Sequence, residues 1–79
     1  MMTTQERQRK AENLGAVADI GKKVKATYPG AFRRDEVATI VGWKFTKDDW
    51  LIYIIQFENG ECDFVSQTSI KNREYVFVS

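Results

Sequence analysis

Two aromatic residues four positions apart, Tyr28 and Phe32, are the side chains best suited to recognition chemistry. Aromatic faces attract cations. With Asp63 or Glu61, the two rings could form a cage for a cationic side chain, or grip an Arg- or Pro-rich segment of a partner. The alternative is that both rings cap one end of the domain. The predicted ligand surface comprises Tyr28, Phe32, Asp63 and Phe64, with Lys25 and Arg33 on its rim.

The usual catalysts of a small enzyme are missing. The chain has no His, so it lacks the common general base at neutral pH, and a Ser–His or Cys–His nucleophile pair is impossible. One Cys forbids an internal disulfide, and one Cys without His does not supply a structural zinc site. We therefore predict no catalytic residue, no metal and no cofactor. Cys62 is expected to be a small buried residue rather than a reactive thiol.

A basic segment interleaved with aromatic rings offers a second binding hypothesis. Its members are Lys22, Lys23, Lys25, Arg33 and Arg34. Such a face could bind a nucleic-acid backbone or stack bases. The alternative is a solvated strand whose lysines discourage unwanted pairing at a sheet edge.

Four further large rings are too many for one domain of this size to cover fully. They are Trp43, Phe45, Trp50 and Tyr53. Exposed aromatic clusters mark interfaces, and Trp and Tyr are enriched at interface hot spots. We predict that some of these rings form a self-association surface, although for any single ring a place in the core is the alternative.

Length and charge limit the remaining choices. A chain of 79 residues is one small domain. Residues 1–34 carry eight Lys or Arg against three acids, and residues 35–79 carry four against eight, which is unlike a uniformly basic nucleic-acid module. No stretch approaches the roughly 18 apolar residues of a membrane helix. With a lone Cys and no apolar leader, we expect a cytoplasmic protein.

The elements that must position these side chains are strands. Pro29-Gly30, residues 46–49 and Asn59-Gly60 are turn signals. They separate five expected strands, at residues 24–28, 36–46, 50–58, 61–66 and 73–78, with a 3₁₀ turn at residues 67–70. Gly42 predicts a bend or bulge in the long second strand. Strict alternation would place Val37, Thr39, Val41, Trp43 and Phe45 on one face of that strand.

We predict that residues 1–20 form a flexible or weakly helical tail. Residues 1–13 favour helix, with Thr4 as a possible cap, but they have no apolar stripe to pack. Leu14, Val17 and Ile20 could form a short amphipathic turn that ends at Gly21.

The pattern of residues 21–78 resembles the SH3-like and Tudor-like small barrels. A strand opens with Gly21 and Val24, a second strand carries an Ala-x-Ile element at residues 38–40, and a third ends at the Asn59-Gly60 hairpin. The resemblance implies an all-β, five-stranded SH3-like barrel over residues 21–79.

Within that group the chain is similar to the plasmid-borne type II dihydrofolate reductases, which resist trimethoprim. The similarity rests on Gly21, Val24 and Lys25, on residues 30–32 (Gly-Ala-Phe) and on residues 40–43 (Ile-Val-Gly-Trp). It implies a homotetramer with one central active-site pore that binds NADPH and dihydrofolate.

The residues that serve this reaction in the family differ here. The family's pore segment corresponds to residues 62–65, where Asp63 stands for the ligand-contacting Gln and Val65 for the Tyr. Ala26 stands for the substrate-attracting Lys, although Lys25 is adjacent. Four Asp63 carboxylates around one pore would repel each other and the anionic ligands.

The sequence therefore predicts a small, non-catalytic SH3-like binding module, such as a bacterial, plasmid or phage accessory protein. Its expected partner is another protein, and a homo-oligomer is expected. Two alternatives remain open: a type II-like NADPH-dependent reductase and a nucleic-acid-binding barrel.

Overall fold

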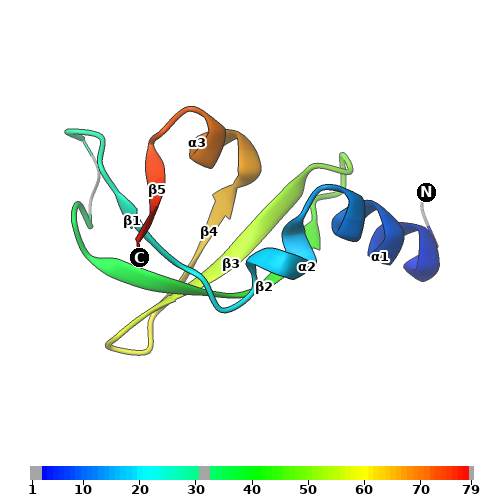
Figure 1. The fold of residues 1–79 in the computed structure, drawn as a ribbon, viewed down its shortest axis with the longest axis horizontal. Helices are drawn as coiled ribbons and strands as arrows, with labels where there is room; N and C mark the ends of the chain where they lie inside the picture. Colours follow the sequence, from blue (N-terminus) through cyan, green and yellow to red (C-terminus); the bar gives the residue numbers. More distant parts are fainter. Residues whose placement is uncertain (1–2, 31–32, 79) are drawn as a thin grey trace.

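Five antiparallel strands form one sheet in the computed structural model, which describes residues 3–30 and 33–78 (Figure 1). The strands are β1 (Lys23–Ala26), β2 (Val37–Phe45), β3 (Leu51–Phe57), β4 (Cys62–Ser66) and β5 (Tyr75–Val78). Their order in the sheet is β4-β3-β2-β1-β5. The predicted all-β core with five strands is confirmed. Because β4 and β5 are the two edges of this order, the sheet is open.

The bulge expected at Gly42 is present. Ile40 pairs with Ile55, whereas Gly42 pairs with Ile54, so Val41 is the extra residue of β2. An extra residue reverses the alternation of side chains beyond it. Val41 is accordingly exposed, and Trp43 and Phe45 pack against the core that also contains Ile40. The expectation that Val41, Trp43 and Phe45 share one face is wrong for this reason.

The core lies on one face of the central strands. β3 alternates strictly, with Leu51, Tyr53, Ile55 and Phe57 all buried. Buried residues of the neighbouring strands complete it, namely Val24, Ala26, Ala38, Ile40 and Val65. The central position predicted for this strand agrees with its place between β2 and β4.

The N-terminal segment forms a ten-residue helix, α1 (Thr4–Asn13), which extends away from the sheet in Figure 1. Its cap is Thr3 rather than Thr4: the Thr3 hydroxyl accepts a hydrogen bond of 3.1 Å from the Glu6 backbone N–H. Ala11 is fully buried and belongs to the core cluster. A small side chain therefore gives this polar helix a packing contact that a search for large apolar residues overlooks.

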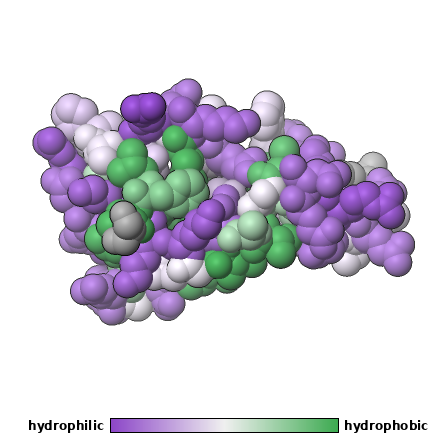
Figure 2. Space-filling view, viewed as in Figure 1, coloured by the Kyte–Doolittle hydropathy of each residue, from purple (hydrophilic) through white to green (hydrophobic). Residues whose placement is uncertain are grey.

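A second, four-residue helix, α2 (Ala16–Asp19), connects α1 to β1 and lies beside β2. Ala16 is the residue it buries. The larger apolar residues around it, which the sequence suggested as its packing face, are exposed: Leu14, Val17 and Ile20. Figure 2 shows apolar side chains gathered beside α2 and the middle of β2, whereas α1 is covered with hydrophilic side chains.

The turn before the last strand is α-helical rather than 3₁₀. It is α3 (Gln67–Lys71), and the Ser66 hydroxyl caps it by accepting a hydrogen bond of 3.1 Å from the Ser69 backbone N–H. Arg73 then adopts a positive φ of 62°, which reverses the chain into β5.

Candidate functional site

The best candidate site is a pair of tyrosines where β1 ends and β5 begins. The Thr27 backbone N–H donates to the Glu74 carbonyl at 2.9 Å, and the Thr27 hydroxyl donates to the Arg73 carbonyl at 2.8 Å. These bonds extend the β1–β5 pairing by one residue and bring Tyr28 against Tyr75. The two rings meet edge to face, with centroids 6.2 Å apart and planes at 61°. Tyr28 is 38% exposed, so its ring remains accessible.

Two acids, Asp63 and Glu74, act on the electrostatics of this pair. The pKa of Tyr75 is raised, first by burial of the ring, then by neighbouring Tyr28, and then by the charge of Asp63, with Glu74 adding to it. A negative potential that disfavours a phenolate favours a cation at the same place. Asp63 comes from β4 and Tyr75 from β5, so the site draws on both edges of the open sheet.

Asp63 is held in position by its own strand. Its Oδ1 accepts a hydrogen bond of 2.8 Å from the Phe64 backbone N–H. Successive residues of a strand point to opposite faces, so Asp63 shares its face with buried Val65, and Phe64 faces the other way. Phe64 is 54% exposed, with the Lys44 ammonium 4.3 Å from its ring centroid. The structure therefore separates Phe64 from the tyrosine site.

The other predicted members of the ligand surface are placed as follows. Lys25 is half-buried in β1 next to Ala26, which pairs with Tyr75, so Lys25 lies on the opposite face of the sheet from Tyr75. Phe32 lies outside the described residues. The sequence therefore anticipated Tyr28 and Asp63 but missed Tyr75. The usable signal was an aromatic residue just after the expected helical turn, at the start of the last strand.

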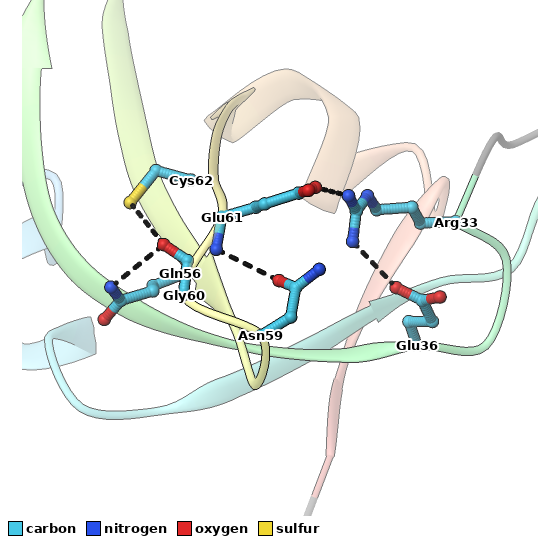
Figure 3. Close-up of polar contacts among 7 residues, drawn as sticks. All are labelled: Arg33, Glu36, Gln56, Asn59, Gly60, Glu61 and Cys62. Atoms are coloured by element: carbon cyan, nitrogen blue, oxygen red, sulfur yellow. Dashed lines mark hydrogen bonds and ion pairs between the residues drawn. The ribbon is translucent and has the colours of Figure 1, made fainter.

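Arg33, which was predicted on the rim of the ligand surface, makes its contacts within the molecule and acts there as a clamp (Figure 3). Its guanidinium pairs with Glu61 of the β3–β4 hairpin and, at 3.1 Å, with Glu36. It also lies 4.5 Å from the ring centroid of Phe57. With a side chain only 21% exposed, Arg33 ties the loop after Tyr28 to the hairpin.

The hairpin that receives Arg33 has its own supporting bonds, also drawn in Figure 3. The Asn59 side chain accepts from the Glu61 backbone N–H at 3.0 Å, and the Gln56 amide donates to the Gly60 carbonyl at 3.3 Å. Cys62 is exposed, with its Sγ 4.0 Å from that carbonyl. The expectation that Cys62 is buried is therefore wrong, because Cys62 pairs with exposed Gln56 on the face of the sheet away from the core.

The four rings predicted for self-association differ in their exposure to solvent. Tyr53 is 1% exposed and belongs to the core. Trp43 and Phe45 meet edge to face, with centroids 5.9 Å apart, and both pack against the core. Trp50 is 67% exposed, so of the four it is the one that presents most of its surface to solvent.

The five basic residues proposed for nucleic-acid binding do not all face solvent as free charges. Lys22 forms an ion pair with Asp19 at 2.9 Å and lies over the Phe77 ring. Arg33 is the clamp described above, and Arg34 lies 3.9 Å from Asp35. The positive charge of this segment is partly neutralised within the fold.

Across residues 3–30 and 33–78, no three carboxylate or thiol side chains are grouped so that they could hold a metal ion. None of the helices in these ranges is long and apolar enough to cross a membrane. No protein-family model, no curated protein and no solved structure matches the chain.

Proposed function

We propose that this chain is a small, non-catalytic binding module of SH3-like type, whose Tyr28–Tyr75–Asp63 site accepts a Lys or Arg side chain from a partner protein. The observation that carries this proposal is the edge-to-face tyrosine pair with an exposed Tyr28 ring, and the charges of Asp63 and Glu74, which help to raise the pKa of Tyr75, favour a cationic ligand there. A cation over an aromatic face contributes about 0.5–2 kcal/mol, with more when water is displaced.

Three features of the fold support the SH3-like assignment. β1 lies between β2 and β5, the long second strand is bulged at Gly42, and a short helix precedes the last strand. The bulged second strand and the helical turn before the last strand were expected from the sequence pattern, whereas the pairing of β1 with β5 comes from the structure.

The acidic character of the site separates this proposal from its two alternatives. A type II-like reductase and a nucleic-acid-binding barrel would both take anionic ligands, which Asp63 and Glu74 repel. In addition, Val65, which stands where the reductase family has a functional Tyr, is buried.

A peptide titration tests the proposal directly. Fluorescence anisotropy would compare a labelled Arg- and Lys-containing decapeptide with the same peptide carrying Gln at those positions. We expect the wild-type protein to prefer the cationic peptide, and Asp63→Asn and Tyr28→Ala to lose at least about fivefold in affinity. Tyr28→Phe keeps a ring and should retain binding.

Glu58→Gln is the matched control, since it removes one exposed acid from the hairpin, outside the site. Equal binding of the two peptides, or equal losses in Asp63→Asn and Glu58→Gln, would overturn the proposal.

A further inference from the structure

We infer that a second copy of this chain binds at a hollow beside Trp50, so that the protein forms a two-fold symmetric dimer. The hollow has a volume of about 380 Å³ and lies where α1, the turn at residues 46–50 and α3 meet. Its lining includes Lys10, Leu14, Asp48, Asp49, Trp50 and Lys71. Trp50 and Leu14 are the exposed apolar residues of its lining. A large, exposed Trp beside a hollow is typical of an interface hot spot.

The backbone fixes Trp50 in a tight turn. The Thr46 backbone N–H donates to the Trp50 carbonyl at 2.8 Å, and the Trp50 backbone N–H donates to the Thr46 hydroxyl at 3.2 Å. The Asp49 backbone N–H donates to the Thr46 carbonyl at 2.9 Å, with Asp49 at a positive φ of 64°. A side chain presented on a rigid turn loses little backbone entropy when it binds.

The charges around Trp50 favour a second copy of the chain as the occupant. The hollow has two lysines, Lys10 and Lys71, and two aspartates, Asp48 and Asp49. In the part of the chain that the structure describes, none of these four side chains forms an ion pair. A two-fold axis brings each patch against itself, so that residue i of one copy meets residue j of the other and the reverse. A two-fold axis that sets the lysines of one copy against the aspartates of the other makes this patch complementary to itself.

This surface is distinct from the tyrosine site. Tyr28 follows β1, whose Lys25 pairs with Val37 at the start of β2. Trp50 follows the turn at the other end of β2, just after Phe45 and Thr46. Loss of dimerisation and loss of cationic-peptide binding can therefore be observed separately.

The first test is the mass of the full chain in solution, by sedimentation velocity over a wide range of protein concentrations. We expect a reversible dimer. Trp50→Ala should weaken it at least tenfold, and Leu14→Ala should weaken it in the same direction. Phe64→Ala removes an exposed ring outside the hollow and should leave it unchanged. Circular dichroism checks that each variant is folded.

A charge exchange then tests the two-fold arrangement. Asp48→Lys alone and Lys10→Glu/Lys71→Glu alone each place like charges across the axis, so each should be monomeric. Their equimolar mixture should form a heterodimer, because opposite charges meet again. A monomeric wild type, a dimer indifferent to Trp50→Ala, or a mixture that stays monomeric would each overturn the inference.

Discussion

The Tyr53 hydroxyl donates a hydrogen bond of 2.6 Å to Oδ2 of Asp19, a residue 34 positions earlier in the chain. The Tyr53 hydroxyl oxygen also accepts a hydrogen bond of 3.0 Å from the Gln67 side-chain amide, and that amide donates to the Leu14 carbonyl at 2.8 Å. The Tyr53 ring is buried in the core. This one hydroxyl therefore links α2, the central strand β3 and α3.

Tyr53→Phe tests the contribution of this link. The substitution keeps the ring in the core but leaves Asp19 and Gln67 without their shared partner. We expect the free energy of unfolding in urea to fall by about 1–3 kcal/mol. The control is Tyr28→Phe, at an exposed ring, where we expect a change within about 0.5 kcal/mol. Equal effects of the two substitutions would contradict a special role for the Tyr53 hydroxyl.

Stability should also fall at alkaline pH. Burial, and then the hydrogen bond to Asp19, raise the pKa of Tyr53 from 10.0 to about 12. The folded protein therefore keeps the phenolic proton at pH values where the unfolded chain has lost it. The raised pKa of Tyr53 therefore contributes to the free energy of unfolding. This contribution is complete below pH 10 and is lost as the pH rises through about 12.

Urea unfolding at several pH values in this range is the measurement. The free energy of unfolding of Tyr53→Phe should fall less steeply with rising pH than that of the wild type. A residual slope is expected, because the pKa of Tyr75 is raised in the same direction. The explanation fails if the free energy of unfolding of the variant falls as steeply with pH as that of the wild type.

Two glycines should respond differently to substitution by Ala. A Cβ on Gly42 would meet Cδ1 of Ile54 at 3.6 Å, an ordinary contact, and its φ is not positive. Gly60, in the hairpin, has a φ of +88°. We expect Gly42→Ala to change the free energy of unfolding by less than about 1 kcal/mol and Gly60→Ala to lower it by about 1–2 kcal/mol. Thermal melts would show which substitution is more destabilising. A larger loss for Gly42→Ala than for Gly60→Ala would contradict this account of the bulge.

The strand positions could be read from the sequence because turn residues mark their ends. Asn59-Gly60 and the polar residues 46–49 do separate β3 from its neighbours. The bulge at Gly42 was predicted as well, but alternation alone does not show which residue is the extra one. The faces of Trp43 and Phe45 depend on that choice. Because the sequence does not show which residue is the extra one, the burial of Trp43 and Phe45 could not be predicted.

The candidate site was predicted in part for a related reason. Tyr28 and Asp63 stood out as a ring in a loop and an acid in a strand. Tyr75 becomes their neighbour only through the pairing of β1 with β5, the first and last strands. Such a long-range pairing has no local signature in the sequence. The same limitation applies to Arg33, whose partner Glu61 belongs to another hairpin.

Arg33 and Arg34 are adjacent in sequence but should differ in their contribution to stability. Arg33 pairs with Glu61 and Glu36 and lies over Phe57, whereas Arg34 is exposed and lies 3.9 Å from Asp35. We expect Arg33→Ala to lower the free energy of unfolding by about 1–2 kcal/mol, part of it from the cation–π contact. Arg34→Ala should change it by less than about 0.5 kcal/mol.

High salt should reduce the loss of stability in Arg33→Ala without abolishing it, because screening weakens ion pairs more than a contact over a ring. Urea unfolding of both variants at low and high salt measures this, and equal losses at the two positions would show that Arg33 does not act as a clamp.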